Sequence, residues 1–433
     1  MTVRIGAALV VLVTGGISIA QSPQAVGAAS APGAASGAAS GAASGAASGP
    51  ASNAAARIER GRYLADAGNC GSCHTRAGGA PFSGGLAFTT KLGTIYSSNI
   101  TPDVQSGIGR WTLEDFRRAM HEGIAPGGRH LFPAFPYTAF TRVSDADVAA
   151  IYAYLRTLPP ARYTPPVNSF LLRQRWGMVF WNLMFFRPGR FRPDPDQSAE
   201  WNRGAYLVGG LGHCDVCHSP RNVFMAERAG RAYAGGTFLD EVSAGRIRAW
   251  SAVNLTASMS GLAAWSVDDL ARYLQSGVCP RAGVFGPMNA VIDNSLRHLS
   301  PQDTHAMAVY LKGLPPRDSG EAVVADAAVK AGARLYGEHC RECHMGSGRG
   351  GLFSAPPLAG SAVVQAPDPA SLINIILYGP SVPKDISLGG WQTMMPYKGD
   401  LSDAQIAAVS SYVRGSWKNR ASEVTAAEVA AQR

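Results

Sequence analysis

The sequence predicts an all-α fold of three tandem domains whose helices are joined by long loops rich in glycine and proline. One stretch of sequence recurs three times with helical spacing of its apolar residues, and alternating strand patterns are scarce. Glycine contributes 50 and proline 28 of the 433 residues, and only 16% of the residues are charged. An average protein has about 25% charged residues. This composition is typical of compact modules with much irregular loop.

The repeats predict the domain boundaries. Each copy opens with a helical Gly-x-x-Leu stretch, which begins at Gly61, Gly204 and Gly332. Each copy closes with an apolar helix behind a serine that is a good N-cap, at Ser144, Ser300 and Ser402. We therefore expect three domains, at residues 57–160, 201–316 and 325–420, followed by a tail at 421–433.

The residues three positions after these serines differ between the copies. They are Asp147, Asp303 and Gln405. Gln405 completes a capping box with its serine, whereas the shorter aspartates match this pattern less well. The third closing helix is therefore expected to have the most complete cap.

The first 20 residues predict export. The charged Arg4 precedes an apolar run that begins at Ile5 and ends in Ser-Ile-Ala at Ala20, which is the pattern of a secretory signal cleaved after Ala20. The alternative is an uncleaved anchor, although a run of about 16 residues with internal glycines is short for a membrane span. Residues 21–56 include four tandem Gly-Ala-Ala-Ser units and predict a flexible tether.

Residues 161–200 separate the first two domains and are too aromatic for a solvated linker. They include an apolar stretch that runs from Leu171 to Phe186. We expect this segment to pack across domains or against a partner protein, with contact to a membrane surface as the alternative.

Each repeat carries the sequence Cys-x-x-Cys-His just behind its opening helix. The three copies occupy residues 70–74, 214–218 and 340–344. Two cysteines alone fit a zinc site, a dithiol or a disulfide, but the appended histidine is typical of covalent c-type haem attachment. Zinc would need further ligands at spacings that are absent here. The sequence therefore predicts three covalently bound haem c groups. Their thioether links would form at Cys70, Cys73, Cys214, Cys217, Cys340 and Cys343, and their proximal iron ligands would be His74, His218 and His344.

The sixth iron ligand decides what a c-type haem does, and His/Met ligation suits electron transfer. A methionine is expected in the loop after the middle helix. The second domain offers Met288 in Phe-Gly-Pro-Met, and the third offers Met395 in Met-Met-Pro-Tyr, with Met394 as its rival. The alternative for each is a methionine that only fills the core.

The first domain departs from this pattern because Phe135 stands where the ligand is expected, and phenylalanine cannot bind iron. Met120 ends the middle helix and is our first choice for the distal ligand. His121 and His130 are nearby candidates, and His130 would give a bis-histidine haem of lower potential. An open, five-coordinate iron is the remaining option.

Several residues outside the haem motifs have simpler interpretations. Seven cysteines leave one, Cys279, outside every motif, and we interpret it as a small buried residue rather than a reactive thiol. Asn99 and Asn254 recur at matched positions and would either bind a haem propionate or fix a turn. The 39 basic and 30 acidic residues give a net charge of +9, which is too sparse for a nucleic-acid-binding protein.

Over residues 57–420 the chain resembles the three-haem cytochrome c subunits of membrane-associated bacterial dehydrogenases. The resemblance rests on the three haem motifs and on segments such as Asn-Ile-Thr-Pro-Asp from Asn99, Pro-Ala-Phe-Pro-Tyr and Phe-Gly-Pro-Met. Phe135 and the Arg-Ala-Met sequence at Met120 look more like the branch that serves molybdenum hydroxylases or aldehyde oxidation than the alcohol and gluconate type.

This resemblance implies an electron-transfer subunit on the periplasmic side of the inner membrane. A separate catalytic dehydrogenase subunit, with or without a small third subunit, would oxidise the substrate, and electrons would pass to ubiquinone or a terminal oxidase. No triad, nucleotide loop or other cofactor motif is recognisable in the sequence, so no substrate-oxidising site is expected here. The alternatives are a peroxidase-like haem enzyme that uses an open first haem, and a free-standing electron shuttle.

Overall fold

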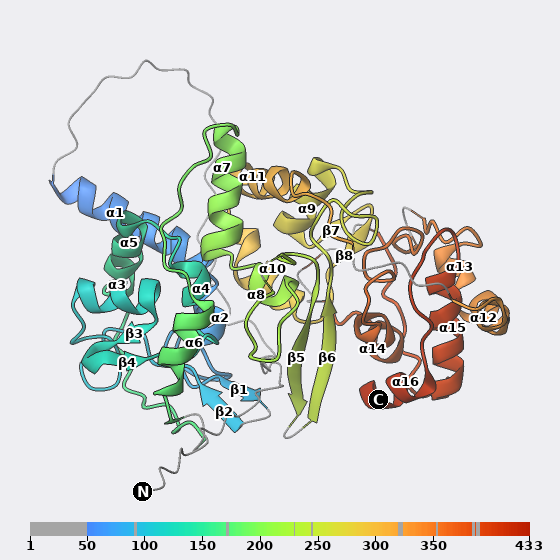
Figure 1. The fold of residues 1–433 in the computed structure, drawn as a ribbon, viewed down its shortest axis with the longest axis horizontal. Coiled ribbons are helices and arrows are strands. Elements are labelled where there is room, and N and C mark those ends of the chain that lie inside the picture. The colour runs from blue at the N-terminus through green and yellow to red at the C-terminus, as the bar shows by residue number, and fades with distance from the viewer. Residues whose placement is uncertain are drawn as a thin grey trace, which may run out of the picture.

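The structure, a computed structural model, describes residues 50–90, 93–169, 173–228, 230–243, 246–318, 324–351, 354–382, 386 and 390–433. The predicted signal at 1–20 and most of the predicted tether at 21–56 lie outside these residues. Within them, three helical units follow one another along the chain and lie side by side in Figure 1. The first helix begins at Pro50, so it includes the last residues assigned to the tether.

Each unit is built around a pair of crossing helices, one from its beginning and one from its end. The opening helices are α1 (Pro50–Ala67), α7 (Ala199–Tyr206) and α12 (Asp326–His339). The closing helices are α5 (Asp145–Leu155), α11 (Pro301–Lys312) and α15 (Asp403–Gly415). The pairs that contact one another are α1 with α5, α7 with α11, and α12 with α15.

The repeated glycines lie where these helices cross. A Cβ atom added to Gly61, Gly204 or Gly332 would lie 2.0, 1.9 or 2.1 Å from the carbonyl oxygen of Ala150, Ala306 or Ala408, respectively. Real Cβ atoms never come that close to a backbone oxygen, so only glycine permits this crossing. The Gly-x-x-Leu signature therefore marks the backbone contact that defines each unit.

The haem motifs form short helical turns directly behind the opening helices. These turns are α2 (Cys70–His74), α8 (Asp215–His218) and α13 (Arg341–His344). A π-helical turn, Leu207–Leu211, joins α7 to the second motif. The middle helices are α3 (Leu113–Glu122), α9 (Val267–Ser276) and α14 (Ala370–Tyr378).

Shorter helices complete the units. They are α4 (Tyr137–Phe140), α6 (Gly177–Phe185), α10 (Met288–Asn294), α16 (Ala426–Gln432) and the 3-10 turns Pro126–Gly128 and Leu296–His298. The predicted tail at 421–433 contains α16, which packs against α14 and α15 and buries Val429 completely. This segment is therefore part of the third unit.

The expectation of an all-α fold is too simple, because the described chain is largely helical but also contains antiparallel hairpins. The strands are β1 (Ala87–Thr90) with β2 (Gly93–Tyr96), β3 (Ile124–Ala125) with β4 (Arg129–His130), β5 (Gly236–Ser243) with β6 (Arg246–Ala252), and β7 (Val278–Cys279) with β8 (Ala282–Gly283). All of them lie in the long loops. Three of the hairpins have strands of only two to four residues, and the alternation in the longer β5 and β6 is too weak to distinguish them from irregular loop in the sequence.

The described residues form two hydrophobic cores rather than three. One core joins residues of the first and second units, from Leu64 to Leu311, and also includes Ile386 of the third unit. The other core belongs to the third unit, from Leu335 to Val429. The first two units thus fold onto each other, and the third packs beside them. Among the described residues, no helix has both the length and the apolar character needed to cross a bilayer.

Candidate haem sites

The three motif histidines share one orientation. The Nδ1 atoms of His74, His218 and His344 lie 2.6, 2.7 and 3.0 Å from the backbone oxygens of Ser98, Val253 and Pro356, respectively. An Nδ1 that donates to a carbonyl carries the ring proton, so Nε2 keeps its lone pair. Histidines that bind metals are commonly oriented in this way.

The electrostatic surroundings of these histidines favour the form that binds iron. Burial lowers the pKa of His74, His218 and His344, and the hydrogen bond to the backbone opposes this effect only in part. The rings are therefore neutral near pH 7, and a neutral imidazole is the ligand that iron requires.

The six motif cysteines are free, half-buried thiols in the structure. Burial raises the pKa of Cys70 and Cys214 to about 12 and that of Cys73, Cys217 and Cys340 to about 11. Each motif places two thiols and an imidazole with a free Nε2 lone pair on a single helical turn. This donor set fits a haem c, with two sulfurs for thioether bonds and one nitrogen for iron.

The candidate distal methionines occupy different surroundings. Met288 begins α10 and is half-buried against the shared core. Met394 packs against the third core, whereas the side chain of Met395 is 69% exposed. The structure thus distinguishes the two methionines that the sequence left as rivals, with Met394 on the inside.

In the first unit Met120 lies near the end of α3 with only 4% of its surface exposed, inside the shared core. His121 is also buried, and its Nε2 atom lies 2.9 Å from the oxygen of Val143. His130 is half-buried in β4. Phe135, which replaces the expected ligand, packs edge-on against Phe140.

Asn99 and Asn254 hold turns. The Asn254 Oδ1 atom accepts hydrogen bonds from the backbone and hydroxyl of Thr256, and its Nδ2 atom donates to the oxygen of Arg317 at 2.8 Å. Asn99 makes the matching bonds to Thr101 and Ala161. Because the polar atoms of both side chains are already bonded, these contacts favour the turn role over a propionate contact. Cys279, the seventh cysteine, is buried in β7, as interpreted from the sequence.

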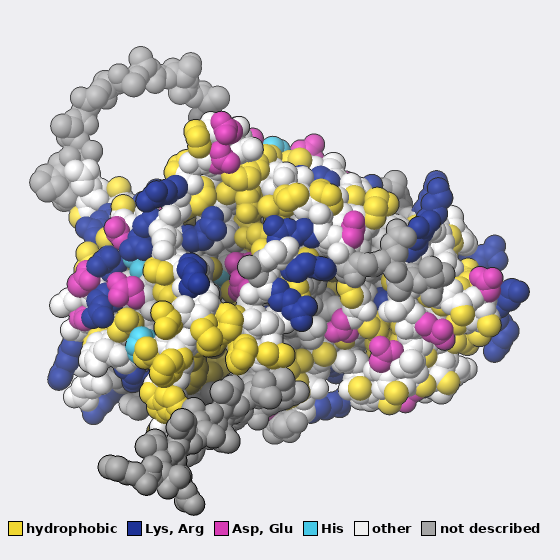
Figure 2. Space-filling model, viewed as in Figure 1, with side chains coloured by type: hydrophobic (Ala, Val, Ile, Leu, Met, Phe, Trp, Pro, Cys, Tyr) yellow, Lys and Arg dark blue, Asp and Glu magenta, His cyan; other side chains and the backbone are white. Residues whose placement is uncertain are grey.

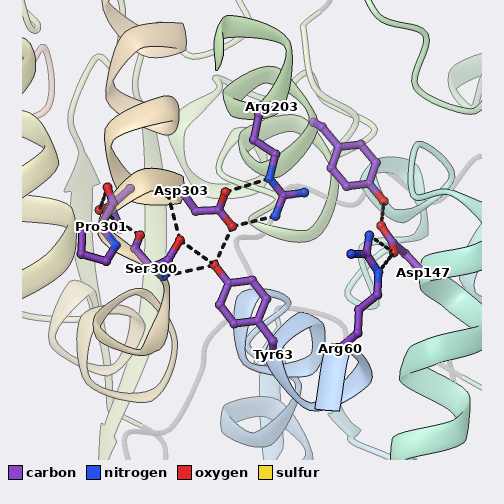
Figure 3. A network of polar contacts seen from close by, with 9 residues as sticks. Arg60, Tyr63, Asp147, Arg203, Ser300, Pro301 and Asp303 are labelled. Carbon is purple, nitrogen blue, oxygen red and sulfur yellow. Dashed lines mark hydrogen bonds and ion pairs between the residues drawn. The ribbon is translucent and has the colours of Figure 1, made fainter. Parts of the chain in front are cut away.

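The first and second units are joined by a reciprocal set of polar contacts (Figure 3). Tyr63 of α1 donates a 2.5 Å hydrogen bond to Asp303 of α11, and Tyr206 of α7 donates a 2.5 Å bond to Asp147 of α5. Each tyrosine also accepts a 3.1 Å bond from the backbone of the serine that caps the same helix. Each unit thus uses one tyrosine to bind the start of the other unit's closing helix.

An arginine from the aspartate's own unit completes each set of contacts. Arg203 binds Asp303 through two nitrogens, at 2.8 and 2.6 Å, and Arg60 binds Asp147 at 2.7 Å. We call these residues the tyrosine clamp: Arg60, Tyr63, Asp147, Arg203, Tyr206 and Asp303. Sequence reasoning missed the clamp. Its signal is an Arg-x-x-Tyr sequence that opens the first two repeats.

The third unit lacks every element of the clamp. Ala331, Arg334 and Gln405 stand where the other units have arginine, tyrosine and aspartate. It is attached instead to β6 of the second unit, where Ser251 and Ser371 exchange three hydrogen bonds. Tyr378 also lies under the guanidinium of Arg248, at 3.7 Å.

The haem motifs of the first two units lie close to this junction. Cys217 is near enough to Cys73 for its charge to contribute to the raised pKa of that thiol, after burial. Helix α10 of the second unit contacts α2 of the first, and His213 packs edge-on against Phe140. The clamp therefore joins two units in which Cys73 and Cys217 lie close enough to interact electrostatically.

Comparison with known proteins agrees with this geometry. Residues 58–159 match the family model described as cytochrome c, and residues 327–413 match the model described as cytochrome c oxidase, cbb3-type, subunit III. The chain is 39% identical to the gluconate 2-dehydrogenase cytochrome c subunit of Pantoea cypripedii, across 87% of this chain and 90% of the relative.

Two further relatives carry related names. The cytochrome c subunit of the quinone alcohol dehydrogenase of Gluconobacter oxydans is 38% identical over 84% of this chain and 80% of its own length. A nicotinate dehydrogenase subunit of Pseudomonas putida is 42% identical over 83% of this chain, but the chain spans only 30% of that relative. Cytochrome c motifs in this geometry, together with relatives matched along most of both chains, show that the chain belongs to the family of cytochrome c subunits of dehydrogenase complexes.

Proposed function

We propose that this chain carries three covalent haem c groups and passes electrons from a partner dehydrogenase, one at a time, to ubiquinone or a terminal oxidase. The observation that carries the proposal is the shared orientation of His74, His218 and His344, each held through Nδ1 by a backbone oxygen. Three equivalent ligand positions support three haem domains, although the two family models cover only the first and third units.

The chain's own residues would hold the haems and keep them apart from water. The motif cysteines would supply the sulfurs for thioether bonds, and the motif histidines would bind iron on one side. Met288 in the second unit and Met395, or Met394 in its place, in the third would supply the second iron ligand. Met120 would do so in the first unit. When bound, a haem c supplies an iron that alternates between the ferrous and ferric states.

The partner and the location follow from the relatives and from the predicted export signal. The named relatives are subunits of gluconate, alcohol and nicotinate dehydrogenases, which supports a catalytic dehydrogenase as the partner of this chain. We place the complex on the periplasmic side of the inner membrane, beside the membrane surface.

The number of haems tests this proposal directly. The chain is produced in a bacterium that attaches c-type haem, and the haem content per polypeptide is measured by the pyridine haemochrome absorbance. We expect three haems in the native chain and two in the variant C340A/C343A. A native content of two, unchanged in this variant, would contradict a haem site in the third unit.

The distal ligands are tested by single substitutions of methionine. We expect M120A, M288A and one of M394A and M395A to remove part of the near-infrared band that marks methionine-to-iron coordination. The unaffected member of the Met394/Met395 pair serves as the matched control.

Carbon monoxide distinguishes electron transfer from a peroxidase-like activity at an open first haem. Reduced native protein should bind little carbon monoxide, and M120A should bind one equivalent. Stoichiometric binding by the native chain would show an open iron and favour the haem enzyme instead. Co-purification with a large catalytic subunit argues against a free-standing shuttle.

A further inference from the structure

Asn289 follows Met288, the candidate distal ligand of the second unit, in the first turn of α10. Its side chain reaches out of its own unit. The Nδ2 atom donates a 2.9 Å hydrogen bond to the backbone oxygen of Ser381, in the loop after α14 of the third unit. On the face drawn in Figure 2 the second and third units form one continuous surface, and only 8% of Asn289 is exposed. The neighbour of one candidate ligand is thus bound to another unit.

The loop that receives this bond lies against the other candidate ligand segment. Residues 379–382 follow α14 directly, and a Cβ atom added to Gly379 would lie 3.0 Å from the backbone oxygen of Met394. The Tyr397 N–H also donates to the oxygen of Ile376 in α14, at 2.9 Å. The loop at 379–382 therefore connects the segments that carry the two candidate distal methionines.

Both sides of this connection are held in place. Val382 packs against the core that the first two units share, and Ile386 is part of that core. On the other side, a Cβ atom on Gly286 would lie 2.7 Å from the Trp250 ring, so the Phe-Gly-Pro-Met loop rests on β6. Ser381 has a φ of 50°, in the left-handed region that few side chains adopt. Such a backbone persists where the surrounding contacts hold it.

The amide of Asn289 is bonded through its nitrogen alone. Its Oδ1 atom is buried and has no hydrogen-bond partner in the part of the chain that the structure describes. A buried amide oxygen without a partner lowers stability, and a leucine of similar size would avoid this cost. Stability alone therefore does not account for an asparagine here. What leucine lacks is the donor to Ser381.

We propose that Asn289 is a positioning residue that fixes the distal loops of the second and third haem sites to each other. Through its bond to Ser381, the position of Met288 depends on the loop beside Met394. The reduction potential of the second haem then depends on the third unit, whereas that of the first haem does not. A methionine ligand raises the potential of a haem, so loosening this loop should lower it. The inference rests on the proposed function, because both units must carry a haem.

The variant N289L tests the proposal, because it removes the donor and nearly keeps the volume. Haem content is measured first, so that a missing haem, which contradicts the proposed function, is recognised separately. A redox titration followed by absorbance and EPR then resolves the haems, and the second is the one absent from C214A/C217A. At a fixed potential we expect the ratio of reduced to oxidised second haem to fall about fivefold, as for one lost hydrogen bond, with no loss of stability towards urea. An unchanged second haem, or an equal shift of the first, overturns the proposal.

The matched control is S371A. It removes hydrogen bonds to Ser251 at the same boundary between units, but at the other end of α14, and should leave the ratio for the second haem unchanged. G379A perturbs the loop from the third unit, since the φ of Gly379 is 73° and a Cβ would press on the Met394 oxygen. It should lower the ratio for the second haem in the native chain but not in N289L, where the link is already lost. Equal effects of G379A in both backgrounds, or of S371A and N289L, would show a general loosening and contradict the proposal.

Discussion

The first two units are joined by two buried carboxylates, each bound by a tyrosine and an arginine, whereas the third is joined to the second where α14 packs on β6, through serine hydroxyls and an arginine–tyrosine contact. In the clamp, Asp147 and Asp303 each receive a tyrosine of one unit and an arginine of the other. In the third unit the same position is Gln405, whose side chain binds the backbone of Ser402 in a capping box.

This difference shows that one repeat position serves two purposes. A residue three places after an N-cap either completes the cap of its own helix or reaches to another unit, because its side chain has one set of acceptors. The aspartates that fit a capping box poorly in the sequence are those that the clamp uses.

All three units share the close crossing of an opening and a closing helix at a glycine. This crossing is tested in the third unit, where the clamp is absent. In G332A the new Cβ would lie 2.1 Å from the oxygen of Ala408, so α12 and α15 must separate. At Gly337, in the same helix, a Cβ meets nothing within 4 Å. We expect G332A to lower the free energy of unfolding by about 3 kcal/mol, and G337A to leave it unchanged or raise it by up to about 1 kcal/mol. Urea unfolding of the haem-loaded protein measures both, and equal values would contradict the close crossing.

Removing the charge of Asp303 breaks one half of the clamp. Burial raises the pKa of this carboxyl, but the hydrogen bonds from Arg203 and Tyr63 outweigh it and hold the pKa below its usual value. We expect D303N to lower the free energy of unfolding by about 2 kcal/mol at pH 7, measured by urea unfolding.

The lowered pKa of Asp303 predicts that the free energy of unfolding depends on pH. The carboxylate stabilises the fold above its unfolded pKa of about 4, and this stability is lost as the pH falls through the lower folded pKa. Native protein should therefore lose more stability than D303N between about pH 4 and pH 2. Parallel pH profiles of the two proteins would show that Asp303 does not contribute in this way.

The tyrosines should contribute less than the carboxylate and should contribute equally. Y63F and Y206F each remove the hydrogen bond donated to the aspartate and the one accepted from the serine backbone, and leave the arginine in place. We therefore expect each to cost about 1.5 kcal/mol. Thermal unfolding followed by absorbance of the individual variants measures this. A large effect of one variant and none of the other would show that the two halves of the clamp are not equivalent.

The smallest effect is expected at the cap of the third unit. Q405A removes the 2.9 Å hydrogen bond that the Ser402 backbone N–H donates to the Gln405 Oε1 atom. We expect a loss of about 0.5 kcal/mol, well below the effect of D303N at the equivalent position. An effect as large as that of D303N would indicate that Gln405 also joins units.

Much of the local structure was predictable from the sequence. The glycines of the opening helices, the serine caps and the haem-motif turns lie where the repeats indicate, because each depends on residues within a few positions of one another. The hairpins were not predictable, since most of their strands are short and the alternation of apolar and polar residues in β5 and β6 is weak. The choice between Met394 and Met395 was open for a similar reason. The sequence of a loop lacks the periodic pattern that, in a helix or strand, indicates which of two neighbouring residues faces the core.

The sequence by itself determined the three opening and closing helices with their caps, and it predicted the chemistry of the Cys-x-x-Cys-His turns, because covalent spacing and helix geometry act over short distances. Only the tertiary structure decided that Tyr63 meets Asp303, 240 residues away, that the first two units share a core, and that Asn289 of the second unit binds Ser381 of the third. These features depend on how whole helices pack, and packing brings together residues whose separation in the chain carries no signal of their contact.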